Sequence, residues 1–212
     1  MSGASKGEQE AMQRLIEVVK KTDRTTRDPG IRKRFASLPR APIRIICCEL
    51  DKGINHGNIL RIAECFRLEE VCFTPVPRKK MRDFSGCVAA LKWQKYSWIR
   101  AVDAIQEAKS YGYTIYGLTL QGGAKALRDV KWRLPCAIVL GSEMEGLEED
   151  VEKGCDEFVS IPLYGMVQSL NVAVTAGIVV EHCFSEYVKD HPDFLPARKA
   201  SRKLVEKNTK RS

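Results

Sequence analysis

Apolar residues occur along the chain in two kinds of segment that follow each other in turn. Short, nearly continuous apolar runs are typical of buried strands, and we predict strands at residues 43–50, 69–74, 113–120, 136–140 and 158–163. Apolar residues at helical spacing, or runs of small and branched residues, predict helices at 8–21, 31–38, 57–67, 102–111, 150–153 and from 172 onward. Strands that alternate with helices need crossovers, so the predicted fold class is α/β, one domain with a parallel sheet covered on both faces.

Three of the predicted strands lead into loops that are rich in glycine and polar residues, at 118–123, 141–146 and 164–171. Parallel α/β sheets bind their ligands beyond the carboxyl ends of the strands. If the three strands are neighbours, the three loops form one pocket. The last loop ends in Ser169 and Asn171, either of which suits the N-cap of the helix that follows. The alternative is a capped core helix that has no role in binding.

The chain of 212 residues has a formal net charge of +8, and the excess of Lys and Arg lies at its two ends. We therefore expect three parts: a basic N-terminal helical extension at 1–40, a folded domain of nearly balanced charge at 41–188 and a basic C-terminal tail at 189–212. Basic ends around a balanced domain favour nucleic acid over a small substrate as the partner, with salt-sensitive contacts to phosphates.

Neither a membrane nor a metal is an expected partner. The longest uncharged run, 158–180, is interrupted by polar residues, and the N-terminus lacks the apolar core of a secretory signal. The eight cysteines form no CxxC pair and only three histidines accompany them, which disfavours a zinc site. Most of these thiols lie in apolar segments, where they behave as small hydrophobic groups: Cys47, Cys48, Cys65, Cys72, Cys136 and Cys183. This composition best fits a reduced, cytoplasmic location.

Two further segments hold candidate functional residues. A loop at 51–58, rich in Asn and Gly, precedes a helix on which Arg61 can face the same pocket as Asn55. Gly141 follows a strand and allows a ligand to approach closely, while Glu143 can accept hydrogen bonds from loop amides or orient an arginine. A surface arginine and a plain turn are the alternatives. Neither a GxGxxG fingerprint nor a Walker-type phosphate loop occurs, and no Ser-His-Asp arrangement is supported by spacing.

Together with the last loop, these segments form a trio: NHGNILR at 55–61, LGSEMEGL at 140–147 and IPLYGMVQSLNV at 161–172. In order and spacing the trio resembles the three motifs of the SpoU-type RNA ribose 2′-O-methyltransferases, in the SPOUT superfamily, and the likeness extends over residues 43–182. The form YGMVQSLN and the pair Lys92-Trp93 are similar to the branch that methylates the D-loop guanosine of tRNA.

The resemblance implies that 41–188 is a methyltransferase domain with a deep trefoil knot near its C-terminal end, a feature that composition and periodicity do not predict. It also implies that S-adenosylmethionine binds in the knot, that the protein is a homodimer with the site near the interface, and that tRNA is the substrate. The residues implied to bind the cofactor are Leu118, Thr119, Gly141, Ile161, Leu163, Ser169 and Leu170.

The resemblance assigns catalysis to Arg61, Asn55, Glu143, Ser169 and Asn171, with Arg61 as the base that deprotonates the ribose hydroxyl. A free guanidinium is protonated at any working pH, which makes this role physically difficult. The alternative is that Arg61 grips a phosphate, and that this phosphate or a perturbed arginine takes the proton. Asn55 is then expected to position Arg61 or the substrate, Glu143 to hold its loop, and Ser169 and Asn171 to order the pocket.

Two other functions remain open at this point. The same chemistry could act on ribosomal RNA or on another tRNA nucleotide. A non-catalytic RNA-binding knot protein is the alternative from a different class, and the presence of all five implied catalytic residues argues against it.

Overall fold

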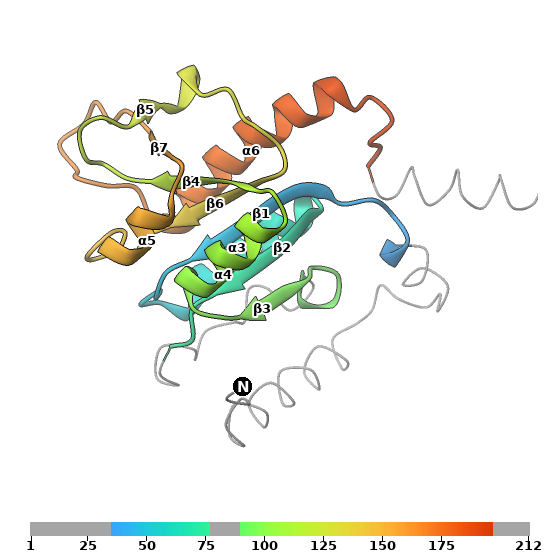
Figure 1. Cartoon of the computed structure of the whole chain (residues 1–212), viewed down its shortest axis with the longest axis horizontal. Coiled ribbons are helices and arrows are strands. Elements are labelled where there is room, and N and C mark those ends of the chain that lie inside the picture. The colour runs from blue at the N-terminus through green and yellow to red at the C-terminus, as the bar shows by residue number, and fades with distance from the viewer. Residues whose placement is uncertain (1–34, 77–89, 197–212) are drawn as a thin grey trace, which may run out of the picture.

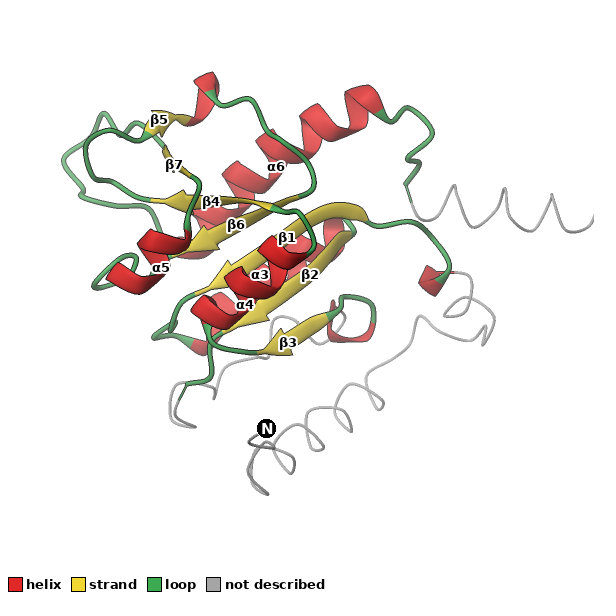
Figure 2. Ribbon diagram, in the orientation of Figure 1, coloured by secondary structure: helices red, strands yellow, loops and turns green. Residues whose placement is uncertain are grey.

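A central parallel sheet organises the protein (Figure 1). The computed structural model describes residues 35–76 and 90–196. Seven strands lie in the order β3-β2-β1-β6-β4-β7-β5, and every pair of neighbours is parallel. They are β1 (Ala41–Cys47), β2 (Leu68–Phe73), β3 (Tyr96–Trp98), β4 (Thr114–Leu118), β5 (Lys125–Ala126), β6 (Cys136–Leu140) and β7 (Glu157–Ser160). The predicted parallel sheet is confirmed, and its carboxyl ends lie along one edge, where the larger strand arrows point in Figure 2.

Helices cover both faces of this sheet. They are α3 (Gly53–Cys65), α4 (Ala101–Ser110), α5 (Glu149–Gly154) and α6 (Val172–Asp190), with short 3-10 helices η3 (Ala90–Lys92) and η4 (Leu127–Asp129). Successive side chains of β1 enter two different cores, because a strand alternates its side chains between faces. Ile45 packs in the core that includes α3 and α6, and Ile46 packs in the core that includes α4 and α5. Figure 1 shows α4 in front of the sheet and α6 behind it, so the double cover is also confirmed.

Predicted and observed boundaries agree best where an apolar run has clear local limits. The strand β6 spans Cys136–Leu140 as predicted, between Pro135 and Gly141. The apolar pattern does not predict β3 or β5, which are three and two residues long. Such pieces are too short to form a recognisable run, so only pairing with a neighbouring strand defines them.

The helix α3 begins at Gly53, whereas the apolar pattern predicts a start at residue 57. Asn55 and His56 therefore belong to the first turns of a helix and not to a loop. Both are buried, with 1% and 0% of their surface exposed. Their contacts with distant parts of the chain outweigh the low helix propensity of Gly and Asn in this segment.

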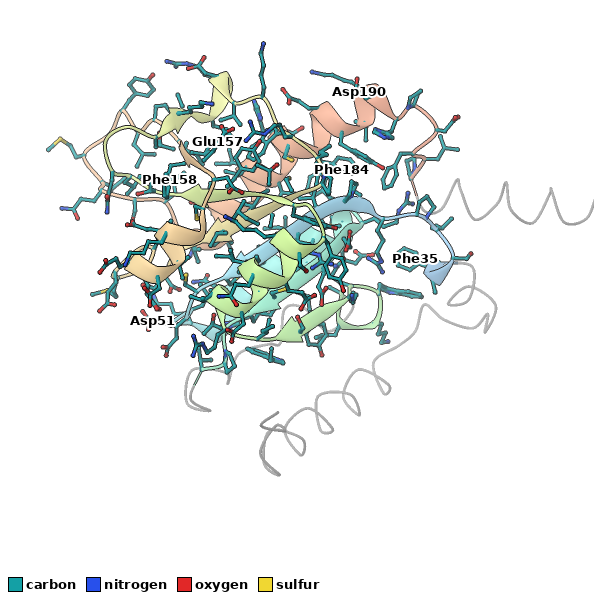
Figure 3. The ribbon with its side chains drawn as sticks, in the orientation of Figure 1. Phe35, Asp51, Glu157, Phe158, Phe184 and Asp190 are labelled. Atoms are coloured by element: carbon teal, nitrogen blue, oxygen red, sulfur yellow. The ribbon has the colours of Figure 1, made fainter. Side chains whose placement is uncertain are left out.

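The chain remains packed beyond the domain boundary predicted at residue 188. The ring of Phe194 lies 5.7 Å from Phe184, which is labelled on α6 in Figure 3, and 5.2 Å from Tyr187, centroid to centroid. The guanidinium of Arg67 lies 3.9 Å from the Phe194 centroid, and it donates a hydrogen bond to the carbonyl of Leu195 at 3.0 Å. The segment after α6 is thus fixed against the loop between α3 and β2.

Several predictions fall outside the described residues, namely the helix at 8–21, the first half of the helix at 31–38 and most of both basic ends. The prediction that Cys65 lies among apolar groups is wrong, because α3 turns Ala63 toward the core and leaves Cys65 exposed; the other five named cysteines are buried. In the two described ranges, no helix is both long and apolar enough to cross a membrane.

Candidate functional site

A pocket of about 540 Å³ lies at the carboxyl ends of β6, β4 and β7, which are neighbours in the sheet. The loops after these three strands supply most of its lining, as the sequence predicts. Its volume is typical of small-molecule sites. Every residue implied to bind the cofactor lines it: Leu118, Thr119, Gly141, Ile161, Leu163, Ser169 and Leu170.

A chain of side-chain hydrogen bonds joins the three motifs beside this pocket. Glu143 accepts two bonds from the α3 region, one from the main-chain N–H of Asp51 at 2.9 Å and one from the Asn55 amide at 2.6 Å. The carbonyl oxygen of Asn55 in turn accepts from the Asn171 amide at 3.1 Å. Asn171 then caps α6, since its side-chain oxygen accepts from the N–H groups of Ala173 and Val174. Figure 3 labels Asp51 at this edge of the sheet.

The charge on Glu143 fixes the direction of every bond in this chain. An ionised carboxylate can only accept, so Asn55 must turn its NH₂ group toward Glu143 and its oxygen toward Asn171. Asn171 must then donate to Asn55, which leaves its own oxygen facing the first free N–H groups of α6. One carboxylate thus sets both amide orientations and the helix cap. Asn55 acts from behind the pocket and is not part of its lining.

Replacing Asn55 with Ala is expected to lower the free energy of unfolding by about 1–3 kcal/mol, because it removes the two hydrogen bonds of a buried side chain to Glu143 and Asn171. Urea denaturation followed by circular dichroism measures the change. Asn58→Ala is the matched control, since Asn58 lies on the same helix but is exposed. An equal loss in both variants would show that the bonds to Glu143 and Asn171 contribute nothing.

The loop after β6 is unusually tight. Ser142 and Gly146 exchange main-chain hydrogen bonds of 2.8 and 3.2 Å, and Gly146 adopts a φ of +74°. A Cβ atom at Gly141 would lie 2.3 Å from the carbonyl carbon of Gly146, closer than any real contact. Gly141 is therefore required by the folding of the loop on itself, and this folding holds Glu143 beside Asn55.

Two of the implied catalytic residues, Ser169 and Arg61, do not take part in this hydrogen-bonded chain. Ser169 is not the N-cap of α6, which is Asn171, and it lies in the exposed part of the pocket lining. Arg61 lies on α3 and is exposed, and it is not among the residues that line the pocket of its own chain. A single chain thus brings together Glu143, Asn55 and Asn171, and it leaves Arg61 outside.

Each of the three histidines packs against or binds an aromatic side chain, and none is placed as the base of a catalytic triad among the described residues. The ring of His56 packs against Phe73 and Trp98, with centroids 5.0 and 5.7 Å apart. Burial lowers the pKa of His56, and the Lys52 carbonyl and the charge of Glu143 oppose this only in part. His182 accepts a hydrogen bond from the Trp132 indole at 2.9 Å. His191 stacks on Tyr187, 4.2 Å between centroids.

Outside the three predicted loops, sequence reasoning missed two polar residues of the pocket, Lys52 and Thr175. Thr175 follows Asn171 by one helical turn, so the two side chains share a face, and this spacing could have revealed it. Lys52 precedes the first motif by three residues and is the N-cap residue of α3. The sequence carries no comparable signal for it, because the pattern places the helix start later.

Comparison with known proteins agrees with this architecture. The model of the SpoU rRNA Methylase family matches residues 42–181. The chain is 33% identical over 158 residues to an uncharacterized tRNA/rRNA methyltransferase of Synechocystis, covering 72% of this chain and 40% of that protein. It is 29% identical over 144 residues to the tRNA (guanosine(18)-2'-O)-methyltransferase of Escherichia coli, covering 66% and 62%. The chain thus spans less than two thirds of either relative.

Solved structures share the fold. The TrmH/SpoU tRNA modifying enzyme of A. aeolicus aligns with a TM-score of 0.68 at 20% identity, over 91% of this chain and 95% of that one. The SpoU methyltransferase AviRb of Streptomyces viridochromogenes, in complex with the cofactor AdoMet, aligns with a TM-score of 0.61 at 18% identity, over 71% and 60%. Because the family match covers most of the sheet and all three loops of the pocket, the chain belongs to the SpoU rRNA methylase family.

Proposed function

We propose that this protein transfers a methyl group from S-adenosylmethionine to a ribose 2′-hydroxyl in RNA, and that its substrate is the D-loop guanosine of tRNA. The observation that carries the proposal is the hydrogen-bonded chain from Glu143 through Asn55 to Asn171, which links the three motifs to one another beside one pocket. The choice of tRNA is supported by the form of the last motif and by the named activity of the Escherichia coli relative.

The pocket suits the proposed cofactor because it offers two kinds of surface. Leu118, Ile161 and Leu170 provide apolar contacts for an adenine ring, and the main chain at Gly141 and the hydroxyls of Thr119 and Ser169 provide polar ones. When bound, S-adenosylmethionine supplies an electrophilic methyl group. The role of the pocket residues is to fix the reacting partners in one geometry, which alone accounts for a large part of such rate accelerations.

The acceptor side of the reaction needs a group that holds the RNA and a group that takes the hydroxyl proton. Arg61 binds the phosphate next to the target ribose, and an oxygen of that phosphate accepts the proton, since a guanidinium is itself protonated. Because Arg61 lies outside the pocket of its own chain, it serves the pocket of a second copy. A two-fold dimer makes two such sites from identical surfaces.

The remaining parts of the proposal follow from the family. The loop at 161–171 and α6 form the trefoil knot, the working unit is a homodimer, and the protein acts in the cytoplasm. The basic ends of the chain add salt-dependent contacts to RNA phosphates.

Mapping methylated riboses in unmodified transcripts treated with the purified protein and labelled S-adenosylmethionine tests the proposal. One labelled 2′-O-methyl group at the D-loop guanosine is the expected result. Label in a ribosomal transcript, or at another tRNA position, would favour the same chemistry on a different RNA. Titration calorimetry with S-adenosylmethionine tests the alternative of a non-catalytic RNA-binding protein, because such a protein has no need to bind the cofactor.

A further inference from the structure

A group of cations lies on β5 and on the segment between β5 and β6, at the edge of the sheet next to β7. We call it the basic strip, and it consists of Lys125, Arg128, Lys131 and Arg133, all exposed. Two carboxylates, those of Asp129 and Glu157, form ion pairs with cations of the strip. The strip therefore carries a net positive charge, separate from the basic ends of the chain.

The cations of the strip are not equally available to a ligand. Lys125 and Arg133 both bind Glu157, labelled in Figure 3, with ion pairs of 2.8 Å, and the Glu157 side chain is only 15% exposed. Arg128 pairs with Asp129 at 3.7 Å, and both side chains are about two-thirds exposed, at 70% and 67%. Pairs that are this exposed contribute little free energy, so Arg128 can exchange its partner at small cost.

Tyr164 connects the basic strip to the pocket. Its hydroxyl oxygen lies 3.5 Å from a guanidinium nitrogen of Arg128, and the neighbouring residue Leu163 lines the pocket. Tyr164 is 88% exposed, an unusual state for a large aromatic side chain. Met166, in the same loop, is fully exposed. The rim of the pocket on this side thus presents an aromatic ring next to a weakly held arginine.

We propose that Tyr164 and Arg128 bind the RNA strand where it enters the pocket, with Tyr164 stacking on a base and Arg128 contacting a phosphate. This proposal rests on the proposed function and adds a part of the RNA-binding surface to it. Exposed aromatic rings beside cations are the usual means of holding unpaired nucleotides. A second copy of the chain is a poorer occupant, because two basic strips would repel each other.

The test measures the affinity of four variants for a fluorescent tRNA transcript as a function of salt, with calorimetric titration of S-adenosylmethionine alongside. We expect Arg128→Ala to weaken RNA binding several-fold and to reduce the slope of log affinity against log salt by about one. Tyr164→Ala is expected to weaken binding by roughly 5- to 150-fold, and Tyr164→Phe to bind nearly as the wild type does, since stacking needs only the ring. Affinity for S-adenosylmethionine is expected to stay unchanged.

Arg100→Ala is the matched control. Arg100 is also 70% exposed and also pairs with an aspartate, at 3.5 Å, but it precedes α4 beyond β3, at the opposite edge of the sheet. RNA affinity and salt slope that are the same in Arg128→Ala and Arg100→Ala would overturn the proposal. A shift from dimer to monomer in sedimentation, with RNA affinity unchanged, would instead assign this face to a second copy. Failure of the wild type to methylate any transcript concerns the proposed function and not the strip.

Discussion

Replacing Arg61 with Ala is expected to reduce methyl transfer by roughly 10²–10⁴-fold, the usual contribution of a group that controls proton transfer. Affinity for S-adenosylmethionine is expected to stay nearly unchanged, because in the proposed function Arg61 binds an RNA phosphate and not the cofactor. The fold should tolerate the change, since the position is exposed within α3 and Ala is a good helix former. Single-turnover methylation of a tRNA transcript, with calorimetry for the cofactor, measures both quantities.

The same variant tests whether Arg61 serves the other subunit. In an equal mixture of Arg61→Ala chains with chains that cannot bind the cofactor, a mixed dimer has one site with an intact pocket and an intact Arg61 from the partner chain. Random exchange of subunits would restore about a quarter of wild-type activity. If Arg61 serves the pocket of its own chain, the mixture remains inactive. Near-normal turnover by Arg61→Ala alone would remove the residue from the mechanism.

Gly141→Ala is expected to weaken cofactor binding strongly while most of the fold survives. The added Cβ would lie 2.3 Å from the carbonyl carbon and 2.5 Å from the oxygen of Gly146, and both are main-chain atoms that cannot rotate away. The loop must open, which moves Glu143 away from Asn55. A displacement of about 1 Å in such a site costs on the order of 100-fold in activity, and we expect a comparable loss of affinity for S-adenosylmethionine.

Gly165→Ala is the control for this prediction, because a Cβ there meets no atom within 4 Å although the residue lies in the loop after β7. It is expected to bind the cofactor as the wild type does. Binding by Gly141→Ala at wild-type strength would mean that the loop at 141–146 is free to adopt another shape. The Gly141→Ala chain also supplies the partner for the mixing experiment with Arg61→Ala.

These predictions separate two groups of residues at one site, those that hold the pocket in shape and those proposed to contact the substrate. Glu143 orients Asn55, and Asn55 orients Asn171, so the pocket depends on a carboxylate that accepts its bonds from behind. In the two proposals above, substrate contacts come from elsewhere, from Arg61 of a second copy and from Arg128 and Tyr164 at the rim. Variants of the first group should therefore change stability and cofactor binding, and those of the second should change RNA binding or turnover.

Local sequence determines a large part of this protein. The run Cys136–Leu140 becomes β6 because Pro135 and Gly141 limit an apolar stretch, and the alternation of such runs with helical spacing is sufficient for a parallel sheet. Asn171 caps α6 through bonds to residues two and three positions on, which a local pattern can indicate. The motif loops likewise follow strands that are readable as apolar runs.

Only the tertiary structure decided how these parts act together. Asn55 lies in a helix and not in a loop. The two side chains that bind it there, Glu143 and Asn171, lie 88 and 116 residues away in the chain. No local spacing contains that information, and the same holds for the exposure of Arg61 and for the contact between Arg128 and Tyr164. Propensity and periodicity act over a few residues, whereas a buried polar group is placed by whichever distant partner satisfies its hydrogen bonds.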